Sequence, residues 1–176
     1  MMVEYNEVIK MYKKFYVLIV LLLLVACSNN IKDAIKFKQE YEKYNKEKIE
    51  LNISDKNIIE YKTTEEINKI IKEGTGIIFI GNPKDNASRE SIKLLLDASE
   101  STDLDKIYYI DSLKEIKLNE INNPKIPIVL FVLDGKIIDI NINEKEELTE
   151  DESIDLYNEY LEKIHNVLQD TCDEEC

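Results

Sequence analysis

Short apolar runs along the chain alternate with segments of helical periodicity. Strand-like runs cover Ile58 to Tyr61, Ile77 to Ile80 and Ile107 to Ile110, and the second of these contains no polar residue. A short, continuous apolar run is typical of a strand that is covered on both faces of a parallel sheet. These segments therefore predict three strands inside a layered α/β domain.

Helical patterns separate these strands. Thr63 and Glu66 have the spacing of a capping box, and the isoleucine-rich segment behind them ends at Gly74. A second helix is expected from Ser88 to Ser99, after a turn that contains Pro83. A strand, a crossover helix and a parallel strand form a right-handed unit, so the middle of the chain predicts a parallel sheet.

The last third of the chain has a different pattern. Pro127 precedes the run Ile128 to Val132, and Asp134-Gly135 separates this run from Ile137 to Ile140. Asp-Gly between apolar runs is a strong hairpin signal, so these two strands are expected to be antiparallel. An apolar stripe then predicts a closing helix, with members Ile154, Tyr157, Leu161, Ile164 and Leu168.

This order of elements, with Ile126-Pro127 before the hairpin and Asp134-Gly135-Lys136 at its turn, resembles the thioredoxin superfamily over residues 55 to 170. The resemblance implies an α/β, thioredoxin-like domain over residues 51–170. Its central mixed sheet would have four to five strands with helices on both faces. It also implies that Pro127 is a cis-proline; a trans proline at the start of an edge strand is the alternative.

At the position of the family's Cys-x-x-Cys motif this chain has Asp85-Asn86-Ala87-Ser88. Asp85 takes the place of the nucleophilic cysteine and Ser88 that of the resolving cysteine. Thiol exchange begins with thiolate attack on a disulfide, which neither a carboxylate nor a hydroxyl can perform. We interpret the segment as a helix entry capped by Asp85 or Asn86, with a ligand site at Asp85 or Ser88 as the alternative.

The N-terminal segment has the features of a leader peptide. Lys13 and Lys14 precede 12 apolar residues, Phe15 to Ala26, a run shorter than the roughly 20 residues that span a bilayer. The sequence Leu-Val-Ala-Cys at its end resembles the bacterial lipobox. We expect residues 1–26 to be a lipoprotein signal peptide and Cys27 to carry the lipid; an uncleaved anchor is the alternative. Translation that starts at Met11 would fit a signal peptide better than a start at Met1, because Met1 to Lys10 have no role in a signal peptide.

Residues 27–50 are expected to form the lipid anchor and a polar, lysine-rich helical spacer without a strong apolar stripe; a docking helix is the alternative. The whole chain has a formal net charge of −13. Such an acidic protein is repelled by nucleic acid and by anionic lipid headgroups, so neither is an expected ligand. No cofactor and no metal site are predicted.

Cys172 and Cys176 are the remaining cysteines, in an acidic tail over residues 171–176. Outside the cell a thiol pair is expected to be oxidised, and the carboxylates between the two cysteines disfavour thiolate formation. Three interpretations stay open: an inert disulfide, an exchangeable redox pair, and part of a metal site that lacks further firm ligands. His165, the only histidine, is expected at the surface.

The lipobox and the cysteine-containing acidic tail narrow the resemblance to small extracytoplasmic thioredoxin-like lipoproteins of firmicutes, including bacteriocin transport accessory proteins. This resemblance implies a lipid-anchored location on the outer face of the cell membrane and an unknown protein partner there. The favoured function is a redox-inactive binding or accessory protein. The alternatives are a thiol-disulfide oxidoreductase or electron relay that uses Cys172 and Cys176, and a structural subunit of an envelope or transport complex.

Overall fold

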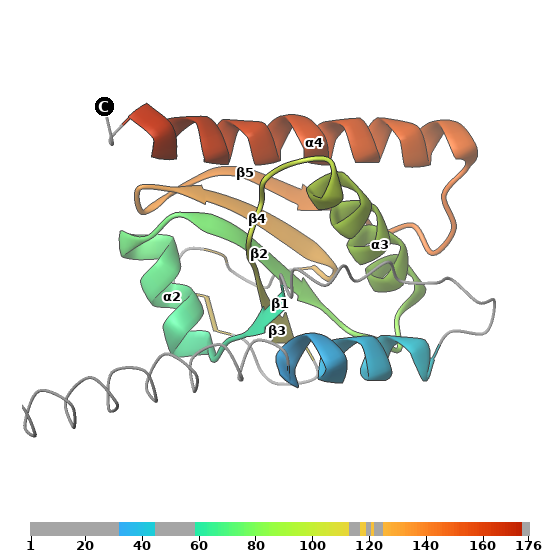
Figure 1. The fold of residues 1–176 in the computed structure, drawn as a ribbon. Coiled ribbons are helices and arrows are strands. Elements are labelled where there is room, and N and C mark those ends of the chain that lie inside the picture. Colours follow the sequence, from blue (N-terminus) through green and yellow to red (C-terminus); the bar gives the residue numbers. More distant parts are fainter. Residues whose placement is uncertain (1–31, 45–58, 113–116, 119–120, 122–124, 174–176) are drawn as a thin grey trace, which may run out of the picture.

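The computed structural model describes residues 32–44, 59–112, 117–118, 121 and 125–173 of the chain. Within these residues it forms a five-stranded mixed sheet with helices on both faces (Figure 1). A helix over residues 32–42 comes first. The labelled elements are β1 (Ile59–Tyr61), α2 (Thr64–Glu73), β2 (Gly76–Gly81), α3 (Asn86–Glu100), β3 (Ile107–Asp111), β4 (Ile128–Leu133), β5 (Lys136–Ile142) and α4 (Glu150–Asp173).

The strand order is β1-β3-β2-β4-β5. The first three strands of the chain are parallel, while β4 runs antiparallel to β2 and β5 antiparallel to β4. The predicted α/β class, the mixed sheet and the hairpin are therefore confirmed. The expected leader, Cys27 and the residues between 45 and 58 lie outside the described residues. Among the described helices, none is long and apolar enough to cross a membrane.

Local sequence signals account for the bounds of α2. The Thr63 hydroxyl accepts from the Glu66 amide (3.3 Å), and the Glu66 carboxylate accepts from the Thr63 amide (2.8 Å), which forms the predicted capping box. The helix ends at Gly74, whose carbonyl accepts from the amide of Gly135 in the hairpin turn (2.8 Å). A Cβ atom at Gly135 would lie 2.2 Å from the Lys72 carbonyl oxygen, so this close approach requires glycine.

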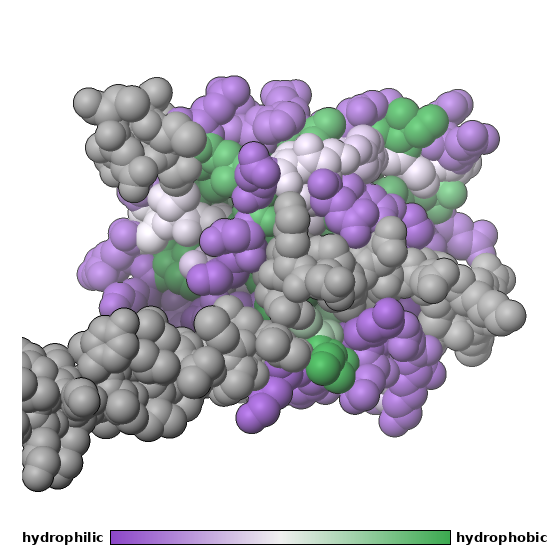
Figure 2. Space-filling view, viewed as in Figure 1, coloured by the Kyte–Doolittle hydropathy of each residue, from purple (hydrophilic) through white to green (hydrophobic). Residues whose placement is uncertain are grey.

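The two faces of the sheet bury different sets of side chains. On one face Phe79, Tyr109 and Phe131 pack with residues of α3, α4 and the helix over 32–42. On the other face Ile78, Leu130 and their neighbours pack with α2. In Figure 1, α4 lies along β5, and the helix over 32–42 lies at the opposite side of the sheet beside β1 and β3. Figure 2 shows mostly hydrophilic residues on the described surface of this side, with smaller apolar patches between them.

The helix over residues 32–42 differs from the expected polar spacer. Ala34, Phe37 and Tyr41 lie on one side of this helix and are buried. The Phe37 ring stacks on Tyr41 with centroids 4.3 Å apart and meets the edge of Tyr109 at 4.8 Å. Each aromatic ring buries a large apolar area, so these two rings anchor the helix to the sheet. This helix belongs to the folded body.

The stripe predicted for α4 is shifted. Ile154 is 51% exposed, and Tyr157, Leu161 and Leu168 are only partly buried. The buried line repeats mainly at intervals of four residues: Leu156, Tyr160, Ile164 and Val167. Apolar residues cover a broad arc of this helix, and only its docking on β4 and α3 selects which line faces the core.

Phe37→Ala tests whether the helix over residues 32–42 is part of the folded body. We expect a loss of about 3–5 kcal/mol in the free energy of unfolding, because a fully buried ring is removed from a packed cluster. The matched control is Ile35→Ala on the same helix, since Ile35 is 52% exposed and its truncation should cost little. Denaturant unfolding followed by circular dichroism measures both. Equal, small effects of the two variants would contradict the packing described here.

Candidate functional site

The first candidate site lies where β2 ends and α3 begins. Asp85 is the N-cap of α3, and its Oδ2 atom accepts from both the amide and the hydroxyl of Ser88, each at 2.8 Å. The Ser88 hydroxyl in turn accepts from the Asn82 amide (3.1 Å) and is completely buried. Both hydrogen-bonding roles of this hydroxyl are therefore filled inside the protein.

A hydrogen bond from a side chain of α3 also holds the turn ahead of this helix. Arg89 is buried and donates from its guanidinium to the carbonyl of Pro83 at 2.8 Å. Of the two expected caps, Asp85 fills the role, and Asn86 is the first residue of the helix. This geometry favours the helix-entry interpretation of Asp85 and Ser88, because their polar atoms are directed at each other and at the turn.

Pro127 lies at the same edge of the sheet. The Ile126–Pro127 peptide bond is cis, and the pairing of Ile80 with Ile128 places Pro127 across from Gly81. Asp111 pairs with Gly81 on the other side. The topology therefore brings the end of β3, the end of β2 and the start of β4 together, next to the start of α3. This end of the sheet, at the carboxyl ends of the parallel strands, is called the candidate edge below; it is distinct from the outer strands β1 and β5.

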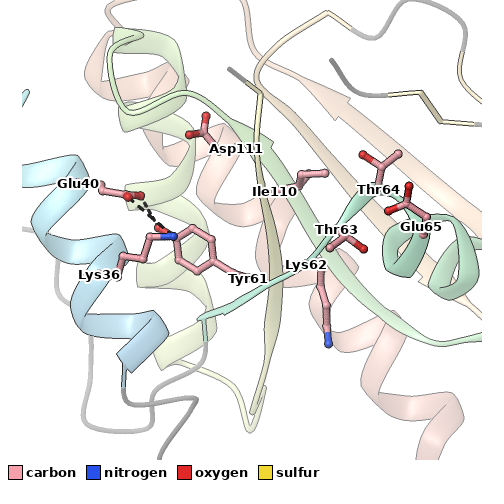
Figure 3. Close-up of a pocket in the computed structure, with 9 residues that line it drawn as sticks. All are labelled: Lys36, Glu40, Tyr61, Lys62, Thr63, Thr64, Glu65, Ile110 and Asp111. Atoms are coloured by element: carbon pink, nitrogen blue, oxygen red, sulfur yellow. Dashed lines mark hydrogen bonds and ion pairs between the residues drawn. The ribbon is translucent and has the colours of Figure 1, made fainter. Parts of the chain in front are cut away.

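A pocket of about 430 Å³ opens at this edge, between the helix over 32–42 and the start of α2. Figure 3 shows Lys36 and Glu40 entering from that helix, Tyr61 from the end of β1, and Asp111 from the end of β3. Ligands of α/β proteins commonly bind at the carboxyl ends of parallel strands. The lining residues are Lys36, Glu40, Tyr61, Lys62, Thr63, Thr64, Glu65, Ile110 and Asp111.

Polar groups of the pocket wall are engaged with one another. The Tyr61 hydroxyl donates to Glu40 at 2.5 Å, and the Lys36 ammonium lies 3.9 Å from Glu40 and 3.8 Å from the centroid of the Tyr61 ring. Burial raises the pKa of the Tyr61 phenol, and the hydrogen bond to Glu40 and its negative charge raise it further. Tyr61 is therefore a neutral hydrogen-bond donor at physiological pH.

An aromatic cluster lies beneath the pocket. Tyr109 stands edge-on to Phe37 and Tyr61, and its hydroxyl lies 3.4 Å from the Gly81 carbonyl oxygen. The buried Tyr41 hydroxyl has no hydrogen-bond partner by distance and angle among the described residues. Burial raises the pKa of both Tyr41 and Tyr109. The two phenols also lie close enough for each to affect the pKa of the other. The cluster joins the helix over residues 32–42 to the candidate edge, where both candidate sites lie.

The described residues include one of the three cysteines. Cys172 falls in the last turn of α4, while Cys27 and Cys176 lie outside the described residues. His165 is exposed on α4, as expected. Within the described part of the chain no three His, Cys, Asp or Glu side chains gather closely enough to hold a metal ion.

Sequence reasoning missed Lys36 and Glu40 as pocket residues, because they stand in the segment interpreted as a spacer. One signal was present: Phe37 and Tyr41 are four residues apart, as on one face of a helix. Asp33 connects the same helix to β1, since its carboxylate accepts a hydrogen bond from the Tyr61 amide at 3.0 Å.

Comparison with protein-family models finds no match for this chain, and no curated protein matches it.

Asp85→Ala tests the structural role of the helix entry. We expect about 1–2 kcal/mol of destabilisation, because the cap is lost and the buried Ser88 amide and hydroxyl lose their acceptor. Asp85→Asn keeps an acceptor oxygen and should cost less. Asp103→Ala, at an exposed position after α3, is the control. Chemical denaturation measures all three, and an Asp85→Ala protein as stable as the control would contradict the structural role.

Proposed function

We propose that this protein is a membrane-anchored, extracytoplasmic, thioredoxin-like lipoprotein without thiol chemistry at the motif position, and that it binds a protein partner at the cell surface. Support for the thioredoxin-like assignment comes from the strand order β1-β3-β2-β4-β5 and the antiparallel β4–β5 hairpin. The position of Pro127, across from the end of β2 where α3 begins, supports it further.

The pairing of Asp85 with Ser88 is the observation that carries the redox-inactive part of the proposal. In the proposed thioredoxin-like assignment these two side chains take the positions of the two thiols. Here they cap α3 and hold its preceding turn. Without sulfur at either position no mixed disulfide can form there. The edge of the sheet is then available for binding, with the pocket at the ends of β1 and β3 as a neighbouring recess.

The proposed lipid on Cys27 would hold the folded body close to the bilayer. The first described helix begins at residue 32, five residues after Cys27. Even fully extended, five residues reach no more than about 18 Å. Because this helix packs on Tyr61 and Tyr109, such a tether would limit both the distance and the orientation of the candidate edge relative to the membrane.

Cys27→Ser tests the anchor. In cells fed a fatty-acid analogue, we expect the unsubstituted chain to be labelled and to sediment with membranes, and Cys27→Ser to lose the label, because the thiol is the proposed acylation site. Cys172→Ser is the matched control and should stay labelled. Label that persists in Cys27→Ser would contradict the lipoprotein assignment.

Thiol exchange separates the binding role from the oxidoreductase alternative. We expect the full chain to show no disulfide reductase activity and its Cys172–Cys176 pair to stay oxidised in strongly reducing glutathione buffers. Thiol counting by mass spectrometry and an insulin-reduction assay measure this. Activity that disappears with Cys172→Ser would show that the tail performs the chemistry.

The same assay can test the motif position. In a Cys172→Ser, Cys176→Ser background, the double substitution Asp85→Cys with Ser88→Cys should introduce thiol exchange if the position is the thioredoxin-like one. Asp85→Cys alone is the control, because it has a thiol to attack but none to resolve the mixed disulfide.

A further inference from the structure

An ammonium group of the chain itself lies in the pocket between the helix over residues 32–42 and the start of α2. The Lys36 Nζ atom lies 3.8 Å from the centroid of the Tyr61 ring and 3.9 Å from the Glu40 carboxylate. Figure 3 shows the Lys36 side chain reaching from its helix toward Tyr61, next to Glu40. An aromatic face and a carboxylate are both groups that bind ammonium ions in proteins. This wall of the pocket is therefore suited to a positive charge.

Lys36 is held only weakly at this position. Its side chain is 56% exposed, and Glu40 stands four residues away on the same helix. Water and salt screen an exposed pair of this kind, and lysine has a flexible stem of four carbons. A cation from outside can therefore replace the Lys36 ammonium while Lys36 turns into solvent.

The charges of the pocket favour a cation over an anion. Its charged lining residues are the carboxylates of Glu40, Glu65 and Asp111 and the ammonium groups of Lys36 and Lys62. The Lys62 ammonium lies 2.6 Å from Glu60 and 3.6 Å from Glu66, two carboxylates outside the lining. Its charge is thus compensated without the pocket carboxylates. When Lys36 turns away, the lining keeps an excess of negative charge.

The start of α2 does not reverse this preference. The amino end of a helix attracts anions because its first amides lack partners within the helix. In α2 the Glu66 amide donates to the Thr63 hydroxyl, and the Thr63 amide donates to the Glu66 carboxylate. Glu65 and Glu66 also place two negative charges in the first turn. An anionic ligand would be repelled by these carboxylates.

The volume and the apolar lining of the pocket indicate an organic cation. The pocket encloses about 430 Å³, which lies in the range of about 300–1,000 Å³ that is typical of sites for small organic ligands. The Tyr61 ring and Ile110 provide apolar surface beside the charged groups. A carbon chain that ends in an ammonium group matches both parts of this lining.

We propose that this pocket binds the ammonium end of an alkylamine chain, either a free amine or the lysine side chain of a protein, at the position that Lys36 occupies. The Tyr61 ring face and the Glu40 carboxylate contact the ammonium group, and Lys36 competes with the ligand. The site is separate from Cys27 and from the helix entry at Asp85, so it can be tested whether or not the lipoprotein assignment holds.

An NMR titration of the full chain in detergent measures binding through the amide signals of Tyr61, Lys62 and Thr64. The charged probes are n-butylammonium and Nα-acetyl-lysine N-methylamide, and the uncharged Nα-acetyl-norleucine N-methylamide is the control. We expect both charged probes to shift these signals saturably and the control to leave them unchanged. Tighter binding of the lysine probe would indicate a lysine side chain of a protein as the ligand. Butylammonium binding that is as tight or tighter would indicate a free amine.

Two pairs of variants on the helix over residues 32–42 make the test specific. Glu40→Gln keeps an oxygen for the Tyr61 hydroxyl but removes the charge, so it should weaken binding about fivefold. Lys36→Met removes the competing ammonium and should tighten binding several-fold. Lys38 and Glu42 form a similar pair (3.7 Å) on this helix but do not line the pocket. Lys38→Met and Glu42→Gln therefore make the same changes in charge and should leave the affinity nearly unchanged.

Three outcomes would overturn the proposal. The first is that neither charged probe binds saturably. The second is that Glu40→Gln and Glu42→Gln weaken binding equally, which would show only a general attraction of cations to an acidic protein. The third is weaker binding in Lys36→Met, which would show that Lys36 does not compete with the ligand. Circular dichroism of each variant confirms that it is folded.

Discussion

The fold depends on one strand that excludes water from both of its faces. All four side chains of Ile77–Ile80 in β2 are fully buried, so the sheet is stable only if helices cover it on both sides. On one side α2 provides this cover, through Ile67 and Ile71. On the other side α3 and α4 share the task with the helix over residues 32–42, whose Phe37 and Tyr41 complete the aromatic cluster around Tyr109.

The candidate edge follows from the same constraint. Because β2 is central, its carboxyl end lies between the end of β3 and the start of β4, and α3 must begin just beyond it. A helix that begins at this crowded position needs its first amides satisfied locally. Asp85 and Ser88 supply the hydrogen bonds, and the demands of capping account for both side chains without invoking catalysis.

The edges of the sheet contrast with its centre. At one edge β1 is covered by the helix over residues 32–42. The carboxylates of Asp33 and Glu40 on this helix accept hydrogen bonds from the amide and the hydroxyl of Tyr61 in β1. At the other edge α4 covers only one face of β5, and on the opposite face Ile140 and Ile142 remain partly exposed. The molecule thus combines a closed, fully packed centre with one apolar surface that the described elements do not cover.

Local chemistry made much of this predictable from sequence. The capping box at Thr63, the continuous run of β2 and the Asp-Gly turn each depend on neighbouring residues, so the sequence determined the strands, the bounds of α2 and the hairpin. Asp85 as a helix cap was predictable for the same reason.

Tertiary packing decided the rest, because it depends on contacts between distant segments. Only the folded chain shows that Phe37 and Tyr41 reach Tyr109, which turns an expected spacer into part of the core and creates the pocket beside Glu40. Likewise, α4 presents Leu156 and Tyr160 rather than Ile154 because docking selects one line from a broad apolar arc. The bulge at Ile138 of β5 is a matter of strand register, which no local pattern encodes.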